Sequence, residues 1–448
     1  MNTLRPLHPY RLLPLFVAMG AALALPVQAQ NLVGLYESAR TYDASYQSAK
    51  SQYDATVARA AQAKAAILPT ANLAAGLSRT NLENSNPAAD RTYTTQTATV
   101  SASQPLYRPA NVATYQQGIK QIDLAQAQLA AADQELIVRV SQAYFDVLAA
   151  MDTLTFVRAQ KSAVGEQLAS AKRNFEVGTA TITDTREAQA RFDLGTAQEL
   201  AAENDLRVKK IALDQLVGKT DTQPLPLAQP LVMPELVPND VNAWVAQSEA
   251  DHPSIAQSRL VLDVAQLETQ KAQAGHKPTL DLVASYGVNR YPNGNPIVGS
   301  TTASRTNAAN IGLSFNLPLF AGFATQNRIR ETLALEDKAR NDLEATTRAV
   351  AQSTRTAFFG VQSGRGQVKA LEAAEASSQS ALDANKLGYQ VGVRINIDVL
   401  NSQSKLFQTK RDLARARYDV LLGGLRLRQA SGTLKAQDLQ SVNVLLAP

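Results

Sequence analysis

The sequence predicts a mixed α and β membrane protein whose chain contains two similar halves in tandem. Three observations predict this fold: an N-terminal secretory signal, two long stretches without proline, and two pairs of segments in which apolar and polar residues alternate. Of the 448 residues only 6% are aromatic. This composition suits long helices that pack through small side chains better than a thick globular core.

Residues 1–29 are predicted to be a secretory signal peptide. Arg5 and Arg11 supply a basic start, residues 12–25 form an apolar run, and Ala29 ends a small-residue cleavage site. The run has 25 − 12 + 1 = 14 residues, fewer than the ~20 that a helix needs to cross a bilayer. We therefore expect the mature chain to begin at Gln30.

The residue counts exclude several functional classes. The chain has no Cys and three His, so it offers no disulfide, thiolate metal site, thiol nucleophile, lipid-anchoring cysteine or histidine metal cluster. Without the two arginines of the signal peptide the net charge is (44 − 2) − 39 = +3. The sequence has no long block of consecutive Lys and Arg, so we do not expect a nucleic-acid partner. No nucleophile and base pair is apparent, so we expect neither an enzyme nor a cofactor.

The proline map divides the mature chain. No Pro lies between Pro109 and Pro224 or between Pro318 and Pro448. Since Pro inside a helix costs ~3 kcal/mol or more, long helices belong in these two stretches. Between the two stretches, residues 219–240 form a Pro-rich connector.

The two proline-free stretches belong to an internal duplication. Pro69 matches Pro278 at an offset of 278 − 69 = 209, and Ala143 matches Ala357 at 357 − 143 = 214. We therefore divide the chain into a first repeat (30–218), the connector (219–240), a second repeat (241–432) and a C-terminal segment (433–448). A period this long points to two copies of one structural unit.

Each repeat is expected to contain three helices. A helix of intermediate length (32–67 or 241–275) comes first, a long helix follows later (109–177 or 322–388), and another intermediate one ends the repeat (183–216 or 396–430). At ~1.5 Å per residue the long helices would span ~100 Å. Two intermediate helices placed end to end would match one long helix.

Between the first and the long helix, each repeat alternates apolar and polar residues. The predicted strands are residues 71–80, 92–104, 279–291 and 307–317, which form two hairpins. A soluble sheet packed on helices is one interpretation. The signal peptide, aromatic residues near strand ends and small polar opposite faces favour an outer-membrane barrel instead. Because open edges are not tolerated in lipid, other copies of the chain must complete it.

The mature chain resembles the TolC family of outer-membrane export channels. The resemblance is carried by residues 30–32, 143–148, 275–282, 312–318, 388–392 and 398–400 and by the duplicated order of elements. It implies a homotrimer in which three chains of four strands close a 12-stranded β-barrel in outer-membrane lipid. A long periplasmic α-helical barrel continues this barrel, with the connector and the C-terminal segment in an equatorial belt.

The resemblance also implies function and partners. The family exports secreted proteins (type I secretion), small toxic molecules, or both. A periplasmic adaptor protein links it to an inner-membrane transporter of the ABC or RND type. We therefore expect a channel in the outer membrane that extends into the periplasm. A secreted or surface coiled-coil protein, such as an adhesin, is the alternative, but it does not explain the strands or the duplication.

The turns at the periplasmic end are the first predicted site. By resemblance, Val177, Gly178 and Thr179, together with Val391, Gly392 and Val393, meet the adaptor. The family often has Leu where Thr179 and Val393 stand, so adaptor preference could differ. The alternative is a purely structural role, in which the two glycines only permit a tight turn between two helices.

A gate and a pore constriction are the other predicted sites. By resemblance, Tyr389 pairs with Asp184, and Arg394 bonds Thr183 and Asp184 of a neighbour. From its residue type alone, Asp184 could instead be a helix N-cap. The family narrows its pore with two acidic rings. Asp398 matches the first, but Asn401 stands at the second, so we expect weaker block by multivalent cations.

Two glycine patterns carry less information. Gly218-Lys219-Thr220 resembles the end of a phosphate loop, but the Gly required five residues earlier is Leu213, so a helix C-cap is the better interpretation. Gly360, Gly364 and Gly366 lie inside a predicted long helix, where close packing near the belt is our hypothesis.

Overall fold

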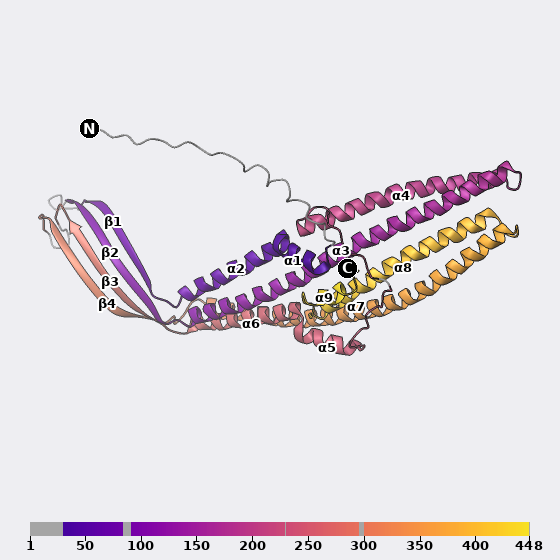
Figure 1. The fold of residues 1–448 in the computed structure, drawn as a ribbon. Coiled ribbons are helices and arrows are strands. Elements are labelled where there is room, and N and C mark those ends of the chain that lie inside the picture. The colour runs from indigo at the N-terminus through magenta and orange to yellow at the C-terminus, as the bar shows by residue number, and fades with distance from the viewer. Residues whose placement is uncertain (1–29, 84–90, 229, 295–299, 448) are drawn as a thin grey trace, which may run out of the picture.

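The computed structural model describes residues 30–83, 91–228, 230–294 and 300–447. The predicted signal peptide lies outside this range. The molecule is a long rod with a β-sheet at one end, helices along its length, and two helical hairpin tips at the other end (Figure 1). The four-stranded sheet and the predominance of helix agree with the mixed α and β fold expected from the sequence.

The helices follow the same order in both halves of the chain. The first half contains α1 (Leu32–Tyr42), α2 (Ala44–Ala65), α3 (Pro109–Glu176) and α4 (Ile182–Val217). The second half contains α5 (Val241–Asp251), α6 (Pro253–Gln273), the short 3₁₀ helix η2 (Ala274–His276), α7 (Ala324–Gln390) and α8 (Asn396–Ala430), and α9 (Asp438–Asn443) follows. No helix among these residues is both long and apolar enough to cross a membrane.

The first helix of each half is broken, which corrects the single helices predicted at 32–67 and 241–275. Asp43 separates α1 from α2, and its carboxylate accepts the backbone N–H of Tyr46 at 2.8 Å as an N-cap. His252 separates α5 from α6 and has extended backbone. Pro253 follows it, and a proline disfavours helical backbone at the preceding residue.

The strands form one antiparallel sheet. They are β1 (Thr70–Leu82), β2 (Arg91–Tyr107), β3 (Thr279–Tyr291) and β4 (Ser304–Asn316), in the order β1-β2-β3-β4. The two predicted hairpins are thus joined by pairing of β2 with β3. At that seam Arg108 Nε donates to Asp281 Oδ1 at 2.7 Å, which ties the start of α3 to the base of β3.

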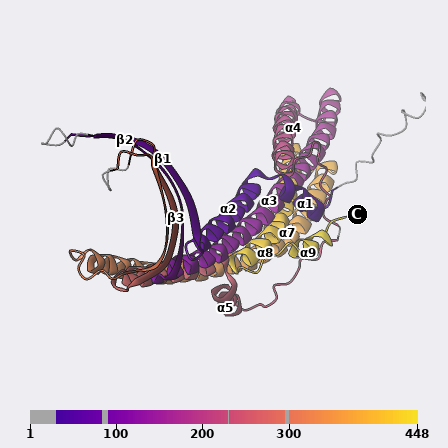
Figure 2. The same ribbon diagram turned by 90° about the vertical axis from the view of Figure 1, so that its left-hand side faces the viewer.

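One face of the sheet is apolar and exposed. Leu73 pairs with Val100, and Val100 pairs with Tyr286. These three side chains are 73%, 50% and 50% exposed, and Ile311 on β4 is 80% exposed on the same face. The opposite face carries small and polar residues such as Asn72, Ser101 and Ser285, which pair across the same strands. The sheet is strongly curved, as Figure 2 shows.

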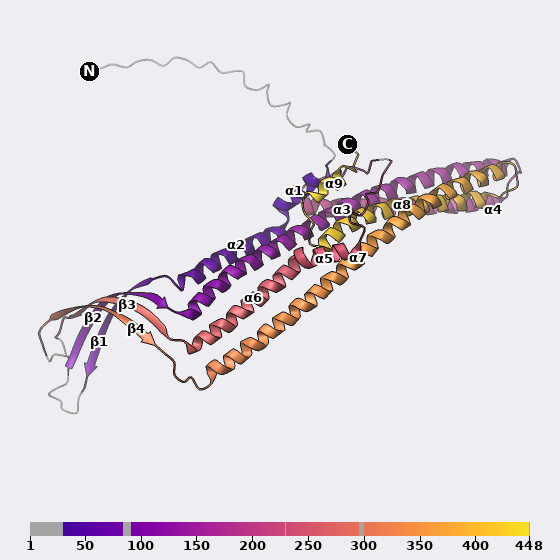
Figure 3. The ribbon, with the colours of Figure 1, turned by 90° about the horizontal axis from the view of Figure 1, so that it is seen from below.

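The rod is thickest near its middle. There α1, α9 and the connector lie against α3 and α8 (Figure 3). Tyr144 and Phe145 of α3 are buried in this core, and Tyr144 donates its hydroxyl to the Leu225 carbonyl at 2.8 Å. On the other side, Trp244 of α5 packs against Phe358 of α7. The long helix α3 contacts both α2 and α4, and α7 contacts both α6 and α8.

Candidate gate and tips of the helical rod

The two hairpin tips have the same backbone. Val177 and Val391 end their helices with φ −90° and ψ 2°, and Gly178 and Gly392 follow with φ 81°. An L side chain is strained at that positive φ, so glycine is needed at both positions. Val177, Val391 and Val393 are 73%, 65% and 75% exposed. Each tip therefore exposes one or two apolar side chains to its surroundings.

Thr179 closes the first of these turns. Its backbone N–H donates to the Asn174 carbonyl at 2.8 Å, and its hydroxyl donates to the same carbonyl at 3.1 Å. In the second turn, Val393 N–H donates to the Gly388 carbonyl at 2.9 Å. The hydroxyl at 179 thus adds a hydrogen bond that Val393 cannot make.

Three of the four predicted gate residues border one hollow next to these tips. A cavity of about 630 Å³ is bordered by Asp184, Tyr389 and Arg394, together with Asn174 and Asn396. These residues come from four different helices or their ends, so the fold gathers them from both halves of the chain. Thr183 lies in the first turn of α4 and is exposed.

Within the described chain, Tyr389 and Asp184 each have another partner. The Tyr389 hydroxyl accepts a hydrogen bond from Asn174 Nδ2 at 3.2 Å. Asp184 belongs to a capping box, in which its Oδ2 accepts Thr181 N–H at 3.0 Å and its own N–H donates to Thr181 Oγ1 at 3.2 Å. The N-cap of α4 is therefore Thr181, and Asp184 is its N3 partner. A Tyr389–Asp184 contact stays a prediction for the assembled protein.

The start of α8 carries the predicted constriction. Arg394 Nη1 lies 3.6 Å from Asp398 Oδ2, one helical turn away. Asn401 Oδ1 accepts a hydrogen bond from Arg191 Nη2 of α4 at 2.8 Å. Asn396 is buried, bonds Gln167 of α3, and donates to the Asp184 carbonyl at 3.5 Å. Polar contacts therefore hold α8 to both α3 and α4 at this end.

The sequence interpretation missed Asn174, Arg191, Gln167 and Asn396. For each of them the partner lies on another helix, more than 200 positions away in the sequence for all four contacts. No local pattern marks such residues. The arrangement joins helix ends through hydrogen bonds and one exposed ion pair, which suits a latch between helices.

The mid-helix glycines divide into two groups. A Cβ at Gly364 would lie 2.9 Å from Val420 Cγ2, so this glycine permits close packing of α7 on α8, as we hypothesised. Gly360 and Gly366 have open space where a Cβ would lie, and nothing in the structure explains them.

Comparison with known proteins agrees with this architecture. The profile of a family described as "Outer membrane efflux protein" matches residues 35–219 and again residues 244–433, once in each half. The outer membrane protein TolC of Vibrio cholerae is 35% identical over 434 residues, which cover 97% of this chain and 98% of TolC. The alkaline protease secretion protein AprF of Pseudomonas aeruginosa is 32% identical and covers 79% of this chain and 73% of its own.

A solved structure has the same fold. The Campylobacter jejuni CmeC outer membrane channel superimposes with a TM-score of 0.79 at 17% identity, over 94% of this chain and 91% of CmeC. The profile match and the relatives confirm the TolC-family resemblance, and with it the outer-membrane location and the role in export. The chain therefore belongs to the outer membrane efflux protein family, a family of transport channels.

Proposed function

We propose that three copies of this chain form a tunnel through the outer membrane and across the periplasm. The observation that carries the proposal is the four-stranded sheet with an exposed apolar face, set on helices about 100 Å long. In one chain β1 and β4 are the outermost strands of the sheet. Three copies would pair each β4 with the next β1 and close a 12-stranded barrel with its apolar face toward lipid.

The tunnel would serve a tripartite export system. The apolar tips at Val177, Val391 and Val393 are suited to hydrophobic contact with a periplasmic adaptor, which in turn would engage an inner-membrane transporter of the ABC or RND type. AprF is named for protease secretion and the family for efflux, so the cargo class includes secreted polypeptides, small toxic molecules, or both. Deletion of the protein, followed by assays of protein secretion and of drug susceptibility, tests these cargoes separately.

The gate would close when the tips of three chains come together. In that state Arg394 would bond Thr183 and Asp184 of a neighbour, and Tyr389 would exchange Asn174 for Asp184 within the hollow that both already border. Hydrogen bonds to a charged partner contribute ~1.5–3 kcal/mol each when shielded from water. Tyr389→Phe combined with Asp184→Ala should raise the single-channel conductance in planar bilayers, and an unchanged conductance would argue against the gate.

The pore constriction would carry one acidic ring, formed by Asp398. Trivalent cations should therefore block this channel weakly. Asn401→Asp alone should strengthen the block only in part, because Arg191 lies 2.8 Å from the side-chain oxygen and would neutralise the new carboxylate. Asn401→Asp with Arg191→Gln should strengthen it further. Equally tight block of all three proteins in planar bilayers would contradict the assignment.

A further inference from the structure

The duplication lets contacts inside one chain predict contacts between chains. The offset of 209 relates α1 to α5 and α2 to α6, since Leu32 corresponds to Val241 and Ala44 to Pro253. The offset of 214 relates α3 to α7, since Ala110 corresponds to Ala324. Burial follows the same correspondence along the long helices. Gly118 and Thr332 are both buried, as are Ala125 and Ala339, and Leu136 and Val350.

One pair of equivalent contacts tests this correspondence. Asn111 Nδ2 of α3 donates to the Ala66 carbonyl at the end of α2, at 2.6 Å. The equivalent positions are Thr325 of α7 and Gly275 after α6, at 111 + 214 and 66 + 209. They also touch, because a Cβ on Gly275 would lie 3.0 Å from Thr325 Cγ2. The α2–α3 and α6–α7 interfaces are therefore copies of each other.

The interface between α3 and α6 has no copy among the described residues of one chain, so its copy is expected between two chains. These two helices pack along each other and join the two halves of the chain. Applying the offsets turns α3 into α7 and α6 into α2. In a closed ring of identical chains, the copy of the α3–α6 interface is therefore α7 of one subunit against α2 of the next.

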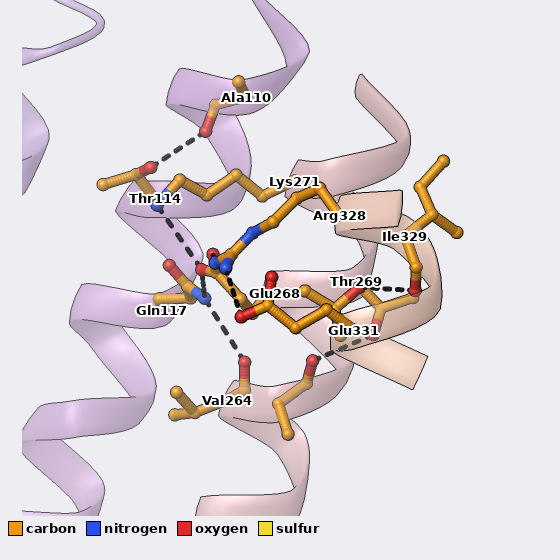
Figure 4. A network of polar contacts seen from close by, with 12 residues as sticks. Ala110, Thr114, Gln117, Val264, Glu268, Thr269, Lys271, Arg328, Ile329 and Glu331 are labelled. Atoms are coloured by element: carbon orange, nitrogen blue, oxygen red, sulfur yellow. Dashed lines mark hydrogen bonds and ion pairs between the residues drawn. The ribbon is translucent and has the colours of Figure 1, made fainter. Parts of the chain in front are cut away.

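Near the sheet end of the α3–α6 interface lies the polar network shown in Figure 4. Gln117 of α3 donates to Glu268 of α6 at 2.9 Å. Glu268 also accepts from Arg328 of α7 at 2.7 Å, and Arg328 reaches Glu331 at 2.9 Å with its other terminal nitrogen.

The offsets place a charge pair where Gln117 meets Glu268. Gln117 corresponds to 117 + 214 = 331, which is Glu331, and Glu268 corresponds to 268 − 209 = 59, which is Arg59. In the first contact the donor lies on α3 and the carboxylate on α6. In its copy the carboxylate lies on α7 and the donor on α2, so the two side chains are again complementary. We propose that Arg59 of α2 forms an ion pair with Glu331 of the partner subunit. This inference rests on the proposed ring of three chains.

The surroundings of both residues fit this pairing. Arg59 is exposed on α2, and the Glu331 side chain is 55% exposed. With the new pair, charges alternate from Glu268 through Arg328 and Glu331 to Arg59 of the next chain. Such a network holds its members more effectively than an isolated surface pair does. Repeated three times, it would form a polar belt where the helical rod approaches the sheet.

Site-specific crosslinking tests the proposed contact. The chain has no Cys, so Arg59→Cys and Glu331→Cys introduce the only thiols. A short bismaleimide should convert the double variant into a covalent trimer on denaturing gels, and each single variant should stay monomeric. Native mass spectrometry first establishes the assembly. Trimers without crosslinks would overturn the Arg59–Glu331 contact alone, whereas absence of trimers would overturn the proposed assembly as well.

Charge reversal provides the second measurement. Arg59→Glu alone and Glu331→Arg alone should each lower the temperature at which the trimer dissociates, and the double reversal should recover most of the loss. Lys50→Glu is the matched control. It lies nine residues before Arg59, and at about 100° per residue this places it on the opposite face of α2. Additive losses in the double reversal would contradict the pair.

Discussion

In each half of the chain, the end of the last helix lies against the break in the first helix. The two junctions have equivalent positions but different side chains. At the first junction the end of α4 lies against Tyr42 at the break between α1 and α2. Asp43 caps α2 there and accepts two hydrogen bonds from Arg139 of α3, at 2.9 and 3.3 Å.

At the second junction Gly432, after α8, lies against the backbone of Asp251 and His252 at the break between α5 and α6. His252 caps α6 through Nδ1, which accepts the Ser254 N–H at 3.1 Å. The position equivalent to Arg139 is Ser353.

The exchange of an ion pair for two neutral side chains leaves room at the second junction. His252 and Ser353 border a hollow of about 770 Å³, with Glu135 of α3 and Arg426 of α8 on its other sides. Duplication thus preserved the backbone geometry and left the side chains free to diverge. We expect the first junction to depend on charge and the second on backbone fit and on histidine protonation.

The largest effect should come from the glycines that end α4 and α8. Gly218 and Gly432 have φ of 69° and 75°, so alanine costs ~1–2 kcal/mol at either position. A Cβ at Gly432 would also lie 2.5 Å from His252 Cα and 2.8 Å from the Asp251 carbonyl oxygen, which are backbone atoms. At Gly218 it would meet the ring of Tyr42, which is 60% exposed and can rotate away.

Gly432→Ala should therefore destabilise the protein more than Gly218→Ala, by about a further 1–3 kcal/mol. Thermal unfolding of the detergent-solubilised protein, followed by circular dichroism, measures the difference in midpoint. The control is Gly218→Ala in a Tyr42→Ala background, where the ring that the new Cβ would meet is absent. There the substitution should lower stability only by the cost of the positive φ. Equal midpoints for the two glycine variants would show that the junctions tolerate a side chain alike.

The junctions also show what the sequence can predict. Periodicity and proline spacing locate the long helices to within a few residues, because these signals are local and repeated. They do not reveal the break at Asp43, where one capping side chain outweighs a continuous helical pattern. The break at His252 could have been predicted from Pro253, which the helix expected at 241–275 ignored. The tip glycines at 178 and 392 could be predicted from backbone physics. The partners of Tyr389 and Asn401 could not, because Asn174 and Arg191 approach them from distant parts of the chain.

Removing the capping side chains should lower stability by different amounts at the two junctions. Asp43→Ala removes a cap and leaves Arg139 without its carboxylate, so we expect a loss of about 2–3 kcal/mol. His252→Ala removes a cap only, and we expect about 1 kcal/mol. Unfolding of Asp43→Ala, Arg139→Ala and the double variant gives the coupling energy between the two residues. A coupling near zero would mean that Asp43 acts only as a helix cap.

The smallest effect is a pH dependence confined to the second junction. Burial lowers the pKa of His252 below its usual 6.5. Protonation of Nδ1 would also remove the acceptor for Ser254. Because the unfolded chain binds the proton more readily, stability is complete above pH 6.5 and falls as the pH drops from 6.5 toward the folded pKa. For Asp43, burial raises the pKa, but hydrogen bonds from Arg139 and Tyr46 outweigh it and lower the pKa below 3.8.

Between pH 7 and pH 5, therefore, only the second junction should weaken. His252→Asn keeps a side-chain cap without a titrating group, so its unfolding midpoint should fall less over this interval than that of the unaltered protein. Asp43→Asn, the matched change at the first junction, should lower stability by a similar amount at both pH values, because Asp43 stays ionised throughout. If His252→Asn and the unaltered protein lose stability in parallel, His252 binds its proton equally well in the folded and unfolded states, which would contradict a lowered pKa in the folded protein.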